Sequence, residues 1–353
     1  MRLISYIFLL FLLVFSHNLI SQNDCKNNLK QAQDLYDGGE FDNCIHYSNS
    51  ALANCLYSKK EKEDFYQLLI QSYLQTDNLV EADTYVKKLL NSNPNYEVPE
   101  NNFTEDYSRL IKKYSVHPLF SIGLRNTVLS PSFKTTKVFS VLLDDVNYSA
   151  PYTTSKTLLM YYGWLEYEFT KNLSVNLEFT GLNIEYNRVL YKRDWDVTFK
   201  EKMTFFESPF YFKKYLFTTK TIFPYASVGM SYLKLLKSSA DVQINYSNES
   251  YLTGEKSSFS RSMTDIDMLS LRKQNSFLWL IGGGVGFKFK NFGLFVDVRY
   301  YGGINNLTKT SNRFGNSSLI NDYFYIDNSI KLNKFEGGIS LSYTIKNLVK
   351  KSK

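Results

Sequence analysis

The residues with the clearest chemical potential are acidic and basic side chains at alternate positions in the last two thirds of the chain. Glu166 and Glu168 are separated by one residue, and so are Asp297 and Arg299. In a β-strand, residues two apart point to the same face. The charged residues that share this placement, and so define one predicted charged face, are Arg125, Glu166, Glu168, Glu178, Lys213, Lys288, Asp297, Arg299, Glu336 and Lys346.

Two neighbouring carboxyl groups can serve as acid and base, but hydrolytic sites of this type commonly rely on a histidine. His46 lies in a helical region, His117 lies at the edge of the first strand candidate, and the long polar segments contain no histidine. The pair Asp144 and Asp145 belongs to one of these polar segments. We therefore expect a protein that is not an enzyme and has no cofactor. The charges on the shared face are expected to pair with one another, because an isolated buried charge is costly.

The segments that carry these charges alternate apolar and polar residues with a period of two, most clearly at 173–180 and 335–346. Short turns and long polar connections alternate between them, the long ones at about 130–156, 186–201, 235–275 and 303–331. This arrangement is typical of an outer-membrane barrel. We predict an antiparallel eight-stranded transmembrane β-barrel over residues 116–347, with strands at about 119–128, 157–169, 173–180, 203–216, 222–233, 277–289, 294–300 and 335–346. Residues 241–248 also alternate, so a further hairpin and ten strands remain an alternative.

The start of the chain indicates export. Arg2 precedes an apolar run from Ile4 to Phe15, which predicts a signal peptide over residues 1–22. Three short turns and four long connections place both ends of the mature chain on the short-turn side. The predicted location is therefore the outer membrane, with the N-terminal module in the periplasm and the long loops outside the cell. Residues 348–353 form a basic tail, and the net charge of +7 comes without any nucleic-acid-binding motif.

Residues 23–115 have the spacing of a small helical module. Apolar and small residues recur at steps of three and four, and Gly38-Gly39 separates two such runs. The second unit resembles a tetratricopeptide repeat (TPR) at Leu69, Ile70, Tyr73, Ala82 and Pro94, and an earlier unit matches more loosely. The resemblance implies stacked helix pairs that present a groove for a peptide or helix. The complete chain is thus predicted to be α+β and multidomain.

Three cysteines, Cys25, Cys44 and Cys55, all lie in this module. An exported chain meets an oxidising environment, where one pair is expected to form a disulfide. Cys44 occupies a helix-packing position, so Cys25 with Cys55 is the preferred pair. No metal site is expected, because no Cys-x-x-Cys motif or histidine pair accompanies them.

Several stretches of the strand region carry a family resemblance. Residues 207–216 (ESPFYFKKYL), 224–229 (PYASVG), 282–287 and 300–305 resemble the PorT-like outer-membrane β-barrel family of Bacteroidetes. The resemblance implies location and architecture, since members serve in secretion, as surface proteins or in unknown roles. The chain departs from the common barrel pattern at its end, where Tyr343 is the terminal aromatic residue and a tail follows it.

Three functional hypotheses follow. In the first, the periplasmic helical module docks a protein partner, as part of a secretion or envelope-assembly machine. In the second, the chain is a surface receptor or adhesin that acts through its long loops, especially 235–275 with Tyr246, Tyr251 and Phe259. In the third it is a small channel, which requires ten or more strands. All three have membrane lipid as a partner and none involves nucleic acid.

Overall fold

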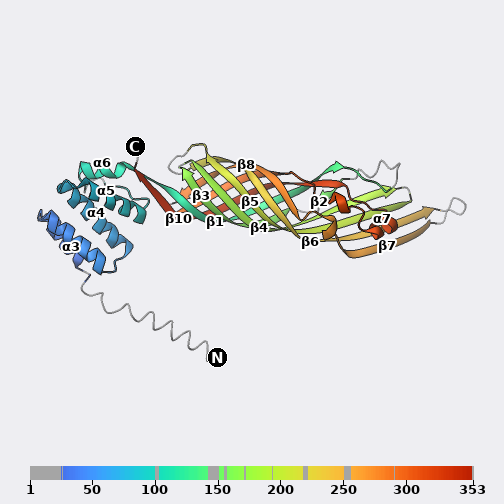
Figure 1. Ribbon diagram of the computed structural model, residues 1–353, viewed down its shortest axis with the longest axis horizontal. Coiled ribbons are helices and arrows are strands. Elements are labelled where there is room, and N and C mark those ends of the chain that lie inside the picture. The colour runs from blue at the N-terminus through green and yellow to red at the C-terminus, as the bar shows by residue number, and fades with distance from the viewer. Residues whose placement is uncertain are drawn as a thin grey trace, which may run out of the picture. The chain divides into compact units, whose positions relative to one another are not determined.

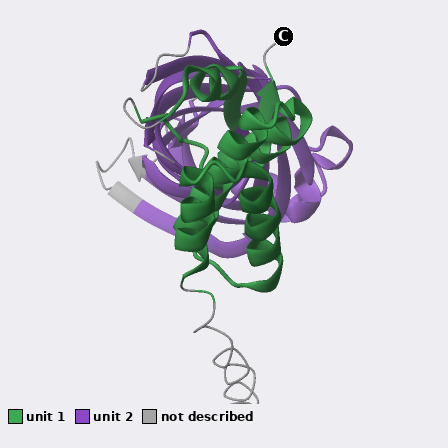
Figure 2. Cartoon of the chain, turned by 90° about the vertical axis from the view of Figure 1, so that its left-hand side faces the viewer, with its two compact units in different colours: residues 1–117, 347–353 green, residues 118–346 purple. Residues whose placement is uncertain are grey.

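The protein is described by a computed structural model that covers residues 25, 27–99, 103–141, 151–154, 157–170, 172–192, 194–217, 222–249, 256–289 and 291–351. The predicted signal peptide lies outside these residues. The chain divides into two compact units, one of residues 1–117 with 347–353 and one of residues 118–346 (Figure 2). No helix among the described residues has both the length and the apolar character needed to cross a membrane.

The first unit is built from short helices joined by tight turns (Figure 1). Gly39, with φ of +78°, makes the turn between the first two. Ser58 begins the longest helix with a capping box, in which its side chain binds the Glu61 amide and the Glu61 carboxylate binds the Ser58 amide. The helices are α2 (Asn28–Asp37), α3 (Phe41–Asn54), α4 (Lys59–Gln75), α5 (Leu79–Ser92) and α6 (Glu105–Lys112).

The helices of the first unit bury a continuous apolar core. Leu69 of α4 and Ala82 of α5 are fully buried, and Tyr107 of α6 closes the same cluster. The end of the chain takes part as well, because Val349 packs against this cluster and Lys351 forms an ion pair with Asp83. Burial acts to raise the pKa of the Asp83 carboxyl, but the hydrogen bond from Lys351 outweighs it and the pKa is lowered.

The second unit is an antiparallel sheet that closes on itself (Figures 1 and 2). Its hydrogen-bonded path runs β4-β3-β1-β10-β9-β8-β6-β5, and pairing of β4 with β5 joins the two ends. Outside this ring, β2 pairs with β4 and β7 pairs with β6. The strands are β1 (Tyr114–Lys137), β2 (Thr153–Thr154), β3 (Leu158–Thr170), β4 (Leu173–Lys192), β5 (Trp195–Tyr215), β6 (Ile222–Glu249), β7 (Lys256–Asp267), β8 (Asn275–Phe289), β9 (Phe292–Gly303) and β10 (Ser329–Lys351).

Alternation in the sequence becomes alternation between the two faces of the ring. On β9, Val296 and Val298 are 47% and 53% exposed, whereas Asp297 and Arg299 are each 3% exposed. The same contrast separates Ile339 from Glu336 on β10. A ring with apolar side chains outside and polar ones inside satisfies its backbone internally, as a lipid environment requires.

Several strands are longer than the sequence predicted, and two predicted long loops are wrong. The segment 186–201 is a hairpin, since β4 and β5 remain paired to Lys192 and Trp195. The segment 235–275 contains the far end of β6 and the whole of β7, paired from Ser239 to Glu249. Polar outward residues made these stretches look like loops, although their inward positions stay apolar. β10 likewise continues to Lys351, through most of the predicted basic tail.

The connection from β9 to β10 is also structured rather than loop-like. It contains two short elements, the 3-10 turn η3 (Thr310–Asn312) and helix α7 (Ser317–Tyr323). A second 3-10 turn, η2 (Leu269–Leu271), precedes β8. Leu319 and Tyr323 of α7 are buried in the same apolar cluster as residues of β4, β5 and β6. The expectation of an ionic interior is therefore wrong for this half of the barrel unit, where the filling is apolar.

We expect a charge on the outer wall to be far more damaging than a charge on an exposed part of the first unit. Ile281→Arg, at a 55% exposed position of β8, should lower the free energy of unfolding by about 2–4 kcal/mol if it faces lipid near mid-depth. The measurement is urea unfolding in lipid vesicles followed by tryptophan fluorescence, since Trp164, Trp195 and Trp279 all lie in the barrel unit.

The control is Leu56→Arg, at an 82% exposed position in the first unit. It should leave the barrel transition within about 0.5 kcal/mol of the wild type, as surface substitutions usually do. Equal effects of the two variants would contradict lipid contact at Ile281.

Candidate functional site

Charged residues gather at the centre of the barrel interior. Arg125 of β1 reaches two carboxylates at once, with Nη1 2.8 Å from Glu336 Oε2 and Nη2 2.7 Å from Asp297 Oδ1. All three side chains are at most 1% exposed. Gly338 of β10 makes room for this arrangement, since a Cβ there would lie 3.1 Å from Arg125 Nε and 2.6 Å from Thr127 Cγ2.

A second arginine extends this central cluster across the barrel. Arg299 of β9 places Nη1 2.9 Å from Glu178 Oε1 and Nη2 3.0 Å from Asp297 Oδ2. Tyr211 of β5 donates a hydrogen bond to Glu178 Oε1 at 2.7 Å and accepts one from Arg299 at 2.9 Å. Four strands that are not all neighbours in the ring are thus tied together through ionic hydrogen bonds, which are stronger than neutral ones.

The structure adds a lysine and a glutamate that the sequence analysis did not select. Lys334 Nζ lies 2.6 Å from both Glu207 Oε1 and Glu336 Oε1, and Tyr162 donates to Glu336 Oε1 at 2.7 Å. The signal was available in the sequence, because Glu207 shares the parity of Lys213 on β5 and Lys334 shares that of Glu336 on β10. Both were missed because the predicted charged face took in no residue before Lys213 on the first strand or before Glu336 on the second.

The remaining predicted charges lie toward the short-turn end. Lys213 Nζ is 3.0 Å from Glu166 Oε1, which also accepts a hydrogen bond from Ser174 at 2.5 Å. Glu168 is buried on the same face, and Lys288 is half-buried. The inward placement of Lys346 is wrong: it is exposed, because it is the last residue of the barrel unit.

A separate ionic cluster lies among the apolar residues of the other half. Arg272, next to η2, forms ion pairs with Glu201 of β5 and with Asp327, the latter at 2.7 Å. Tyr186 of β4 donates to Glu201 Oε2 at 2.5 Å. The sequence analysis missed this cluster, because it placed Arg272, Glu201 and Asp327 in solvated loops. Only folding of the 303–331 connection against the strands brings Asp327 to Arg272.

Residues predicted to pack the helical module lie where α4 meets α5. Leu69 and Ala82 are fully buried, and Tyr73 is 9% exposed. The Tyr73 ring stacks on that of Tyr85, with centroids 5.6 Å apart. Pro94 follows the end of α5 and is half-buried. Contacts between consecutive helices therefore form one stacked layer.

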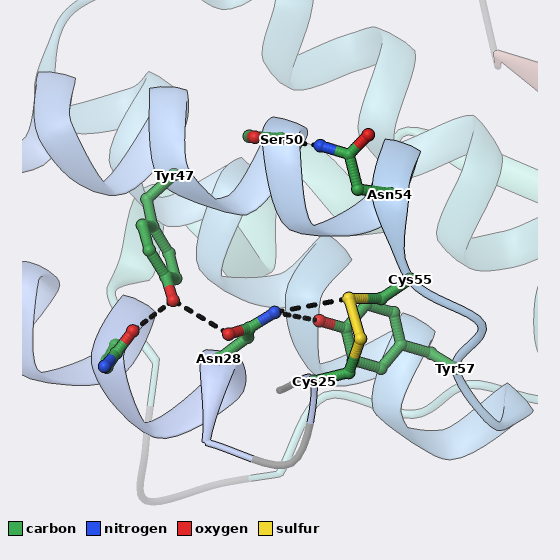
Figure 3. Close-up of a disulfide and its surroundings, with 8 residues drawn as sticks. Cys25, Asn28, Tyr47, Ser50, Asn54, Cys55 and Tyr57 are labelled. Atoms are coloured by element: carbon green, nitrogen blue, oxygen red, sulfur yellow. Dashed lines mark hydrogen bonds between the residues drawn. A yellow bond between two sulfur atoms is a disulfide. The ribbon is translucent and has the colours of Figure 1, made fainter. Parts of the chain in front are cut away.

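The cysteines lie at the start of the helical unit. Cys25 and Cys55 form a disulfide across 30 residues, and Cys44 is a buried free thiol (Figure 3). Asn28 lies beside the disulfide and donates a hydrogen bond to Tyr57 OH at 2.8 Å (Figure 3). The link fixes the first turn of α2 to the end of α3. It constrains the unfolded chain and is expected to stabilise a module with a small core.

The described interior has the arrangement of a packed ionic filling. Its carboxylates are held by arginine, lysine or tyrosine, and among the described residues no group of three or more metal-binding side chains occurs. His46 lies on α3 and His117 on β1, far apart in sequence and on elements of different type. What this filling does chemically is to hold opposite walls of the barrel at fixed separation.

We expect loss of the central arginine to destabilise the barrel strongly. Arg125→Met leaves Glu336 and Asp297 without a main partner, and breaking a buried pair in this way costs about 3–5 kcal/mol. Urea unfolding followed by tryptophan fluorescence measures the loss. Arg261→Met is the matched control, since Arg261 pairs with Asp322 at 3.4 Å on the surface of the same unit.

An exposed pair contributes at most about 1 kcal/mol. If Arg125→Met cost no more than Arg261→Met, the central cluster would not stabilise the barrel.

Comparisons with known proteins agree with this architecture. Residues 141–309 match the family described as outer membrane protein beta-barrel domain. None of the curated proteins compared with the chain matches it.

Three similar solved structures are outer-membrane proteins. OprG from Pseudomonas aeruginosa is 10% identical over 65% of this chain and 96% of its own, with a TM-score of 0.34. CarO from Acinetobacter baumannii is 13% identical over 65% and 98%, with a TM-score of 0.26. The outer membrane protease OmpT from Escherichia coli is 8% identical over 65% and 98%, also with 0.26. Such distant likenesses leave the activity of this chain open. The chain contains an outer-membrane β-barrel domain, and its location is the outer membrane.

Proposed function

We propose that this chain is a non-enzymatic, PorT-like barrel protein whose helical module docks a protein partner in the periplasm, within a secretion or envelope-assembly machine. The proposal includes an eight-stranded barrel, supported by the closed path through β1, β3, β4, β5, β6, β8, β9 and β10. It also includes a TPR-like module, supported by the helix pairs α2/α3 and α4/α5 and the capping position of α6.

The observation that carries the docking proposal is an apolar step on the surface of the helical module. Leu79 and Val80, the first two residues of α5, are 55% and 75% exposed. Adjacent exposed apolar residues in a small module have no role in its own core. They offer contact area to an apolar segment of a partner, which is how stacked helix pairs bind other chains.

The packed interior does not favour the channel hypothesis. Paired charges fill the centre of the described interior, and apolar side chains fill the half next to α7. A path for solutes requires those ion pairs to separate, which costs several kcal/mol for each buried charge.

A surface receptor or adhesin is the second candidate, favoured by the β6–β7 hairpin that extends beyond the ring. Phe259 of β7 is 62% exposed and pairs with Tyr246 of β6, their ring centroids 6.2 Å apart. Exposed aromatic rings on a paired hairpin are a suitable contact surface for a ligand or another cell. Tyr251, predicted for the same role, lies outside the described residues.

We expect two acidic substitutions at the start of α5 to abolish docking without unfolding the module. Leu79→Glu with Val80→Glu keeps the helix favourable, since acidic residues suit a helix N-terminus. After cross-linking in intact envelopes and affinity purification, the main cross-linked partner should fall by about tenfold, the equivalent of 1.4 kcal/mol.

The matched control is Lys59→Glu with Lys60→Glu, at the first two positions of α4, which are exposed and polar. This variant should keep the partner. Loss of the partner in both variants, or in neither, would sink the docking proposal.

Orientation is tested separately by labelling single cysteines with a membrane-impermeant maleimide. We expect Phe259→Cys to react in intact cells, because its hairpin is proposed to lie outside. Lys60→Cys on α4 should react only after the outer membrane is permeabilised. The native Cys44 is fully buried and contributes little background. The opposite labelling order would place the helical module on the cell surface.

A further inference from the structure

The outer wall of the barrel contains a hollow of about 860 Å³ where β1, β3, β9 and β10 meet. It exists because Gly163 of β3 and Gly337 of β10 carry no side chains there, and a Cβ built on either would meet no atom within 4 Å. The surrounding side chains are apolar and point outward. They include Leu124, Val128, Tyr161, Val298, Ile339 and Leu341.

One polar side chain lies in this apolar hollow. Asn126 of β1 is exposed and lines it, between Leu124 at 73% exposure and Val128 at 50%. Among the described residues, its amide has no hydrogen-bond partner in the protein. An amide that faces hydrocarbon without a partner costs free energy, so an occupant that supplies an acceptor is favoured.

The level of Asn126 along β1 limits what that acceptor can be. Beyond Val128, the outward positions of β1 become polar at Ser130, Ser132 and Lys134. Asn126 therefore lies near the edge of the apolar band, on the side of the long connections. Near that edge, membrane lipids carry ester and hydroxyl oxygens at the start of their acyl chains, whereas the bilayer centre contains only hydrocarbon.

We propose that the hollow binds one acyl chain of a membrane lipid, with an ester or hydroxyl oxygen of that lipid accepting a hydrogen bond from Asn126 Nδ2. A flexible hydrocarbon chain fills a concave apolar surface. A second copy of this protein fits less well, because a two-fold interface would set one hollow against another and leave both unfilled. The proposal rests on outer-membrane location and is independent of partner docking.

Native mass spectrometry of protein extracted from outer membranes in mild detergent tests this site. The wild type should retain one lipid per folded barrel. Gly337→Phe fills the hollow and should lower the lipid-bound fraction about tenfold. Asn126→Leu keeps the hollow apolar but removes the donor, and should lower that fraction about fivefold, as for one lost hydrogen bond.

The matched control is Gly181→Phe. Gly181 is an exposed glycine of β4 outside the hollow, where an added Cβ also meets nothing within 4 Å. This variant should retain lipid like the wild type. Shifted electrophoretic mobility of unheated protein confirms that each barrel is folded, and Gly163→Phe replaces Gly337→Phe if the latter fails to fold.

Three results would overturn the proposal. The first is a folded wild-type barrel that retains no lipid. The second is equal retention by Gly337→Phe and Gly181→Phe. The third is a retained mass equal to a second copy of the chain, which would make the hollow a protein interface. A folded barrel with normal partner docking but no lipid would leave the proposed function intact, so the two proposals fail separately.

Discussion

Pairing of β4 with β5 closes the sheet, and every other feature of the barrel unit depends on that closure. A strand edge exposed to hydrocarbon would leave a row of backbone groups without hydrogen bonds, which lipid does not tolerate. Once the ring is closed, each strand has one face toward lipid and one toward the interior. The side chains at alternate positions must then fill a fixed internal volume, and their charges must find partners within it.

The two halves of the interior meet this requirement differently. The centre and the short-turn end use ion pairs, in which Arg125, Arg299 and Lys334 each contact more than one carboxylate. The other half uses apolar packing, with α7 and the residues after it folded against the strands. Buried ion pairs are weak evidence for net stability, but a half-satisfied network is worse than none. Shared carboxylates therefore make the central cluster sensitive to loss of any one member.

The helical unit depends on links between distant parts of the chain. The disulfide joins Cys25 to Cys55, and the end of β10 contributes Val349 and Lys351 to the same unit. A module of a few short helices has a small core, so such links are a common way to stabilise it. Its exposed Leu79 and Val80, by contrast, contribute nothing to that core and are available to a partner.

The sequence alone determined the features that follow from local periodicity. Alternation at 173–180, 292–300 and 335–346 predicted strands and their outward faces, and helical spacing predicted the positions of Leu69 and Ala82 beside each other in a core. Parity also selected Arg125, Asp297 and Arg299 as inward residues. These calls need only a period of two or 3.6, which neighbouring residues already contain.

Tertiary structure decided what periodicity cannot express. The segment 186–201 has polar outward residues and looked like a loop, but pairing with a neighbour makes it a hairpin. Asp327 and Arg272 are 55 residues apart and meet only when the β9–β10 connection folds back. The hollow at Gly163, Gly337 and Asn126 needs three strands brought side by side. Local sequence fixes which face a side chain takes, whereas its partners across the barrel depend on ring closure and register.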